Sequence, residues 1–202
     1  MKQLFLALLL AATLAPASYA ADETPPPKIK VGDMAPDFSA TASLGGKDFT
    51  FKLNEALKKG PAVVYFYPSA YTGGCDLEAH TFAESHEKFE AAVASIIGVS
   101  ADNLERLNQF AADPNFCAGK FPIASDESLN IAKSYNLKTT EAKAGAKDVR
   151  GVEIGHGFIE RVTFVVGKDH KIVAVMSSTD DKLTPDQHVD KSLAIVQKLA
   201  SK

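Results

Sequence analysis

The sequence predicts one α/β domain, with a central mixed β-sheet flanked by helices and an N-terminal β-hairpin extension. Two runs, Ala62 to Tyr67 and Ala94 to Val99, are almost wholly apolar and rich in β-branched and aromatic residues. Such runs are typical of strands that are buried on both faces of a sheet. The residues between them follow helical spacing, so we expect a βαβ unit with its helix packed on the sheet.

The front of the domain has clear turn signals. Phe38 to Ala40 and Phe49 to Lys52 flank Gly45 and Gly46, which predicts the N-terminal hairpin. Pro68 ends the first central strand because proline cannot donate to the sheet ladder. The helix that follows has an apolar face, formed by Ala79, Phe82, Ala83, Phe89 and Val93.

The second half of the chain continues the alternation of helices and strands. We expect a helix from Asn103 to Ala112 with Asp102 as its N-cap, a strand from Phe121 to Ala124 and a helix from Leu129 to Tyr135. A long polar loop from Lys138 to Gly155, strands from Ile159 to Val166 and from Lys171 to Ser177, and a helix from Pro185 to Leu199 capped by Thr184 complete the domain. This order of elements fits a thioredoxin-like fold.

The N-terminus has the pattern of a cleaved secretory signal. Lys2 precedes an apolar run that is too short to span a bilayer, and small residues occupy the expected cleavage positions at Ser18 and Ala20. We therefore expect residues 1–20 to be a signal peptide, 21–30 an extended proline-rich leader and 31–202 the folded domain. The predicted location is periplasmic or secreted, with no membrane attachment after cleavage.

Charge and cysteine content limit the classes of function. Removing one of the 22 basic residues with the signal peptide leaves 21 against 25 acidic residues, a net charge of −4. A mildly acidic chain without a basic block argues against a nucleic-acid partner. The two cysteines, Cys75 and Cys117, are expected in an exported compartment that permits disulfides, and their number leaves a redox pair and a structural bridge equally open.

Cys75 lies where a thiolate is easily stabilised. It begins a predicted helix directly after a buried strand, so free backbone N–H groups and the positive end of the helix dipole face its sulfur, and we expect a lowered pKa. Thr72 can place its hydroxyl near the sulfur, Pro68 can shield it, and Gly73 and Gly74 allow close approach of a small ligand.

These residues form a recognisable motif. Pro68, Thr72 and Cys75 fit the pattern Pro-x-x-x-Thr-x-x-Cys, which resembles the signature of the peroxiredoxins, thiol peroxidases of the AhpC/TSA type. The segment from Val31 to Phe38 resembles the opening of that family, and the segment beginning at Arg161 resembles its late strand with an active-site arginine. The resemblance extends from about Val31 to the C-terminal helix.

The resemblance implies a mechanism. Cys75 would attack a peroxide and become a sulfenic acid, and Thr72 would hydrogen-bond the substrate. Arg161 would keep the sulfur ionised, while Glu78 would orient that arginine. The resemblance implies no metal or organic cofactor.

Cys117 is the candidate resolving thiol. Its distance from Cys75 resembles the branch of the bacterioferritin comigratory proteins, some of which resolve through a cysteine near this position. The resemblance implies an intramolecular disulfide that a thioredoxin-like dithiol protein reduces, and a monomer. The sequence does not decide whether His156, between two glycines, lines the site or only serves a turn.

The sequence leaves three alternative functions open. A disulfide reductase would need Cys-x-x-Cys, but Thr72 occupies the first position of that motif. A copper-delivery module would need a close set of soft ligands, which the distant Cys117 and Met176 do not obviously supply. An inert domain would use the cysteines as a structural bridge. All three predict a protein that does not consume peroxide.

Overall fold

The computed structural model describes residues 27–141 and 143–201. The predicted signal peptide and most of the predicted leader lie outside this part of the chain. Within the described residues, no helix combines the length and the apolar character that crossing a membrane requires.

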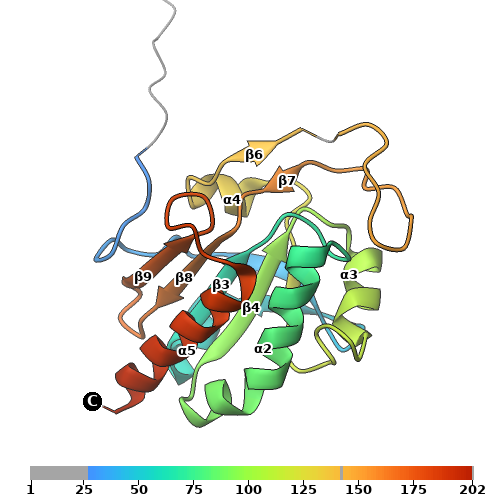
Figure 1. Ribbon diagram of the computed structural model, residues 1–202. Coiled ribbons are helices and arrows are strands. Elements are labelled where there is room, and N and C mark those ends of the chain that lie inside the picture. The colour runs from blue at the N-terminus through green and yellow to red at the C-terminus, as the bar shows by residue number, and fades with distance from the viewer. Residues whose placement is uncertain (1–26, 142, 202) are drawn as a thin grey trace, which may run out of the picture.

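A seven-stranded mixed sheet forms the centre of the molecule, in the order β2-β1-β5-β4-β3-β8-β9 (Figure 1). Its strands are β1 Ser39–Leu44, β2 Lys47–Lys52, β3 Ala62–Phe66, β4 Ser95–Ser100, β5 Ile123–Ser125, β8 Val162–Val166 and β9 Ile172–Ser177. The strands β3, β4 and β5 run parallel to one another, and β8 pairs antiparallel with β3. The predicted mixed sheet and its N-terminal hairpin β1–β2 are confirmed.

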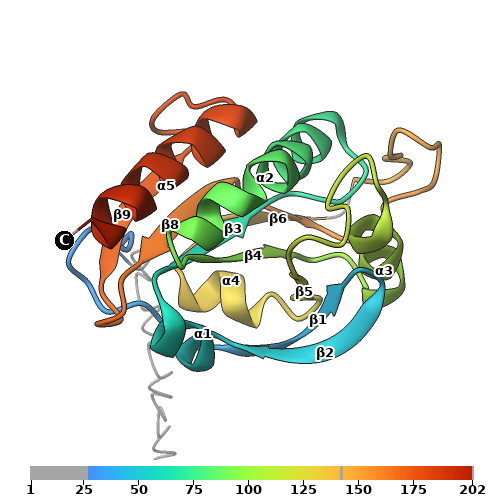
Figure 2. The same cartoon turned by 90° about the horizontal axis from the view of Figure 1, so that it is seen from below.

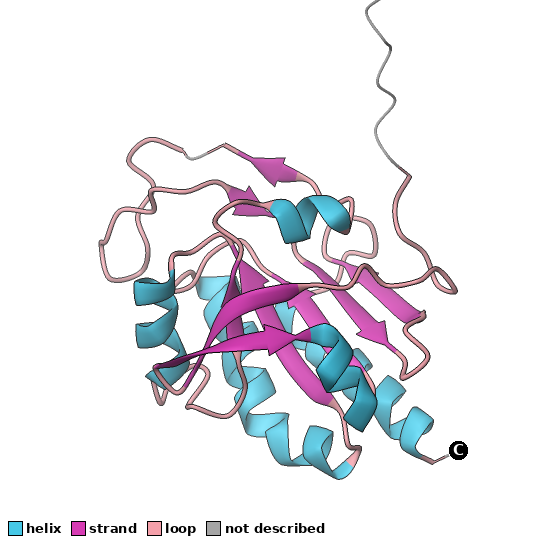
Figure 3. Cartoon of the chain, turned by 180° about the vertical axis from the view of Figure 1, so that it is seen from behind, coloured by secondary structure: helices cyan, strands magenta, loops and turns pink. Residues whose placement is uncertain are grey.

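Helices cover both faces of this sheet. The helices are α1 Leu53–Lys59, α2 Gly73–Ala91, α3 Leu104–Ala112, α4 Asn130–Ser134 and α5 Pro185–Ala200. Helices α2 and α5 lie on one side, and α1 and α4 lie on the other (Figure 2); the view from behind in Figure 3 faces the side of α1 and α4. Two apolar cores result, one on each face of the sheet.

The position of β3 within the sheet explains why its sequence is continuously apolar. All five of its residues are buried, and they point alternately into the two cores. Val64 and Phe66 contribute to the core beneath α1 and α4, whereas Val63 and Tyr65 contribute to the core beneath α2 and α5. A strand with a helical layer on each face has no position for a polar side chain.

Three details differ from the expectation. Helix α1 was not predicted, because it is only seven residues long and follows the hairpin directly. The N-cap of α3 is Asn103, whose side chain accepts a hydrogen bond from the Arg106 amide, and not Asp102. The expected strand from Ile159 to Val166 is interrupted before Val162, since β7 Phe158–Ile159 leaves the main sheet to pair with β6 Thr139–Thr140.

Candidate active site

Cys75 lies in the first turn of α2, at the carboxyl end of β3. The carbonyl oxygen of Thr72 accepts hydrogen bonds from the backbone amides of Cys75 at 2.7 Å and Asp76 at 2.9 Å, which begin the helix. The Thr72 hydroxyl donates to the Ser69 carbonyl oxygen at 2.7 Å. The side chain of Thr72 is thus held toward the loop, and Pro68, half-buried, stands at the start of that loop.

Arg161 reaches this helix start from the segment between β7 and β8. Its Nη2 atom donates to Cys75 Sγ at 3.1 Å, and its Nη1 atom donates to the carboxylate of Glu78. Glu78 is completely buried, one helical turn after Cys75. The structure therefore brings together three of the residues that the sequence singled out, Cys75, Glu78 and Arg161. A planar guanidinium is well suited to hold sulfur and carboxylate at once.

Burial dominates the electrostatics of the site. Cys75 is 2% exposed, and burial raises the pKa of its thiol, while the positive charge of Arg161 acts in the opposite direction. The expected lowering of the Cys75 pKa is wrong for this closed arrangement, because desolvation outweighs the stabilisation of the thiolate. Burial also raises the pKa of Glu78 to about 7, and Arg161 opposes that shift.

Cys117 lies in the turn after α3 and is completely buried. It belongs to the same apolar core as Cys75, which also holds Tyr65 and Tyr67. Both cysteines are free thiols in this structure, and burial raises the pKa of the Cys117 thiol well above its ordinary value.

Comparison with known proteins identifies the family. The model of the AhpC/TSA family matches residues 31–175. The chain belongs to this family. It is a peroxiredoxin, a thiol-dependent peroxidase with a thioredoxin-like fold, and its relatives include bacterioferritin comigratory proteins.

Relatives match nearly the whole domain of this peroxiredoxin. The peroxiredoxin Bcp of Bacillus subtilis is 30% identical over 86% of this chain and 99% of its own length. The crystal structure of peroxidoxin BcpB from Mycobacterium tuberculosis superposes with a TM-score of 0.69 at 29% identity, covering 85% of this chain and 98% of that one. A bacterioferritin comigratory protein of Xanthomonas campestris, whose structure is described in connection with alkyl peroxide reduction, has a TM-score of 0.60 at 26% identity, covering 81% and 92%.

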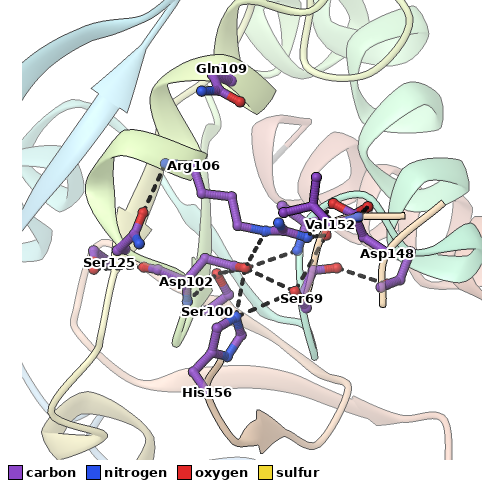
Figure 4. Close-up of polar contacts among 12 residues, drawn as sticks. Ser69, Ser100, Asp102, Arg106, Gln109, Ser125, Asp148, Val152 and His156 are labelled. Carbon is purple, nitrogen blue, oxygen red and sulfur yellow. Dashed lines mark hydrogen bonds and ion pairs between the residues drawn. The ribbon is translucent and has the colours of Figure 1, made fainter. Parts of the chain in front are cut away.

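A polar network lies behind the active-site loop of this peroxiredoxin, which is the loop of residues 67–72 between β3 and α2 (Figure 4). At its centre, the buried carboxylate of Asp102 accepts from the Ser69 hydroxyl and from the Ala70 amide, both at 2.8 Å. Arg106 Nε and His156 Nε2 lie 2.9 Å and 2.7 Å from the same carboxylate. From the sequence, Asp102 was expected only to cap a helix and Arg106 had no assigned role, because nothing local indicates such distant partners.

The structure gives His156 a definite setting. Its Nδ1 atom contacts the Gly157 carbonyl oxygen at 2.8 Å and its Nε2 atom contacts Asp102, so both ring nitrogens face acceptors. Burial lowers the pKa of His156, but the hydrogen bond and the charge of Asp102 outweigh it and the pKa is raised. His156 also lines a cavity of about 590 Å³ between α3 and residues 150–157. Cys75 does not line this cavity.

Proposed function

We propose that Cys75 is the peroxidatic nucleophile of this enzyme. Its thiolate attacks one oxygen of hydrogen peroxide or of an organic hydroperoxide, and the O–O bond breaks. The sulfur is oxidised by two electrons to a sulfenic acid, and the second oxygen takes up a proton and leaves as water or an alcohol. The observation that carries this proposal is the contact between Arg161 and the Cys75 sulfur at 3.1 Å.

The other residues of the site have supporting roles in this proposal. Arg161 stabilises the thiolate and the charge that develops on the peroxide, and Glu78 fixes the guanidinium through its second nitrogen. Thr72 orients the peroxide by accepting from its O–H group, while the Thr72 hydroxyl donates to Ser69, and backbone N–H groups near Gly74 assist. Pro68 shields the thiolate from water at the start of the loop.

Cys117 is proposed as the resolving thiol. Its thiolate attacks the sulfenic sulfur of Cys75, an S–S bond forms and hydroxide leaves with a proton as water. The shared apolar core of the two cysteines supports this assignment. A thioredoxin-like dithiol protein then reduces the disulfide by thiol–disulfide exchange and returns both cysteines to the thiol form.

The range of substrates includes organic hydroperoxides in this proposal. The bacterioferritin comigratory protein of Xanthomonas campestris has alkyl peroxide reduction activity, and its similarity to this chain supports the assignment.

The resemblance to that branch is also the basis for proposing a monomer. Size-exclusion chromatography with light scattering tests this point, since a dimer doubles the measured mass.

Antioxidant defence in an exported compartment completes the proposed function. The signal-like residues 1–20 support this location, and the cysteine pair suits an oxidising environment. Expression of the full chain in a Gram-negative host, followed by fractionation and N-terminal sequencing, tests it. A periplasmic product that begins at Ala21 supports the proposal, and an uncleaved cytoplasmic product contradicts it.

Thiol counting tests the chemistry. The reduced domain is mixed with one equivalent of hydrogen peroxide or cumene hydroperoxide, and free thiols are counted over time in wild type, Cys75→Ser and Cys117→Ser. We expect loss of both thiols in wild type, no rapid reaction in Cys75→Ser and accumulation of sulfenic acid in Cys117→Ser. Wild-type thiols that react only as slowly as free cysteine contradict the proposed function.

A further inference from the structure

Tyr71 links the active-site loop to a distant part of the chain. It directly precedes Thr72, and its φ of 58° lies in the left-handed region that residues with a large side chain rarely adopt. The surrounding structure must therefore hold this residue in place. Its carbonyl oxygen accepts a hydrogen bond from the Val149 amide at 2.9 Å, and its ring lies beneath the Arg150 guanidinium, 3.3 Å from the ring centroid.

Asp148 fixes the position of Arg150. Its Oδ2 atom accepts from Arg150 Nε at 3.0 Å and from Arg150 Nη2 at 2.8 Å. Its Oδ1 atom accepts from the backbone amides of Arg150 and Val152, which closes a tight turn around the carboxylate. The Asp148 side chain is completely buried, whereas that of Arg150 is 32% exposed.

Arg106 joins this turn to the network around Asp102. Its Nη2 atom lies 2.8 Å from Asp148 Oδ2 and donates to the Ala70 carbonyl oxygen, also at 2.8 Å. Asp102 meanwhile binds Ser69 and the Ala70 amide. Three consecutive residues of the active-site loop, 69–71, are thus held from behind by charged side chains. We call Arg106, Asp148 and Arg150 the clamp.

The Tyr71 ring also contacts the segment that carries Cys117. The ring packs edge-on against Phe110 and Phe116, with centroids 5.0 Å and 5.5 Å away, and these two rings stack on each other. Phe116 immediately precedes Cys117. Any movement that brings Cys117 to Cys75 must therefore change the packing around Tyr71.

From these contacts we infer that Asp148 and Arg150 are positioning residues. They hold Tyr71 so that Thr72 and Cys75 are aligned for peroxide. They must release Tyr71 before Cys75 and Cys117 can form their disulfide. This inference rests on the proposed function. It assigns the otherwise unexplained loop of residues 143–157 a role in two steps. The clamp favours the attack of Cys75 on peroxide, which is the first step, and opposes the formation of the disulfide between Cys75 and Cys117, which is the second.

The test measures the two steps separately. Sulfenic acid formation is followed by stopped flow in the Cys117→Ser background, and disulfide formation is followed in a single turnover of the protein with both cysteines. Arg150→Ala removes the guanidinium from the Tyr71 ring. We expect it to slow the first step about tenfold, because catalysis is sensitive to small misplacements, and to accelerate the second step. Arg150→Lys keeps the charge but not the planar group, so both effects should be smaller.

Lys147→Ala is the matched control, since it removes a positive charge from the same loop at an exposed side chain. It should leave both rates at the wild-type value. A general loss of structure in Arg150→Ala would slow both steps, which overturns the inference, as do unchanged rates. If wild type loses both thiols as expected and Arg150→Ala reacts at the same rates as Lys147→Ala, the inference about the clamp is wrong and the proposed function stands. If wild type does not consume peroxide, both fail.

Discussion

The Arg161 guanidinium binds Cys75 and Glu78 at the same time. One nitrogen lies 3.1 Å from the sulfur, and the other donates to the carboxylate of Glu78. Burial pushes the pKa of both acidic groups upward, and the single guanidinium opposes both shifts. The ionisation of Cys75 therefore depends on how one cation is shared between two buried groups.

Replacing Arg161 should impair the attack on peroxide. In Arg161→Gln the main influence that lowers the Cys75 pKa is lost, so less thiolate is present at neutral pH and the transition state loses a charged donor. We expect the rate of sulfenic acid formation to fall by about 100-fold or more, as for the loss of a preorganised donor elsewhere. The measurement is stopped-flow consumption of peroxide against pH, in which the Cys75 inflection should move to higher pH.

Arg161→Gln also leaves the buried Glu78 without its partner, so loss of folding must be separated from loss of catalysis. The double variant Arg161→Gln with Glu78→Gln removes both charges and serves as the folded control. If the double variant reacts with peroxide as fast as wild type, Arg161 does not act on the sulfur.

Glu78 should make stability depend on pH. Its folded pKa of about 7 lies above its ordinary value of 4.5, so the folded state binds the proton more tightly than the unfolded state. The contribution to unfolding free energy is present below about pH 4.5 and is lost as pH rises through 7. Relative to wild type, Glu78→Gln should gain stability between pH 5 and pH 8, as measured by urea denaturation. A relative loss over that range would mean that the ion pair with Arg161 outweighs burial.

His188 on α5 should have the opposite dependence. Its ring is completely buried between the hydroxyls of Thr163 and Ser178, at 2.9 Å and 3.0 Å, and burial together with Arg161 lowers its pKa from 6.5 to about 4. The unfolded state then binds more protons between these values, so stability falls as pH drops from about 6.5 to 4, by up to about 3 kcal/mol.

His188→Gln should remove this part of the acid sensitivity, because an amide can still bond to both hydroxyls without taking up a proton. The free energy of unfolding of the variant, measured by urea denaturation from pH 7 to pH 4, should therefore improve relative to wild type as the pH falls. His80→Gln, at an exposed histidine of α2, is the control and should show less change. Parallel curves for wild type and His188→Gln would contradict the depressed pKa.

Local sequence patterns predicted the parts of the site that are local. The buried strand and the helix start of Cys75 are adjacent in the chain, so spacing and propensity sufficed, although Gly73 and Gly74 are the first residues of α2 and not a loop before it. The contact with Arg161 is not local, and only the family resemblance indicated it. The clamp was missed because Asp148 and Arg150 lie in a polar segment without periodicity, where tertiary ion pairs and not propensity determine the structure.

Close packing at Gly98 in β4 gives a prediction about the core behind the cysteines. A Cβ atom at this position would lie 2.6 Å from Tyr65 Cζ and 2.6 Å from its hydroxyl oxygen. Tyr65 is 1% exposed and stacks on Phe82 at 4.7 Å, so its ring is closely packed on more than one side. Gly98→Ala should therefore destabilise the fold by about 1 to 3 kcal/mol, the usual effect of overpacking.

Gly155→Ala is the matched control, since nothing lies within 4 Å of the Cβ it would introduce. Urea denaturation of the two variants beside wild type compares them directly, and the Gly155→Ala transition should stay close to wild type. Because Tyr65 shares its core with Cys75 and Cys117, a Gly98→Ala protein that still folds should also show changed reactivity of these thiols. If both variants unfold at the wild-type urea concentration, the ring of Tyr65 can yield, and the packing of β4 against this core is looser than the contacts indicate.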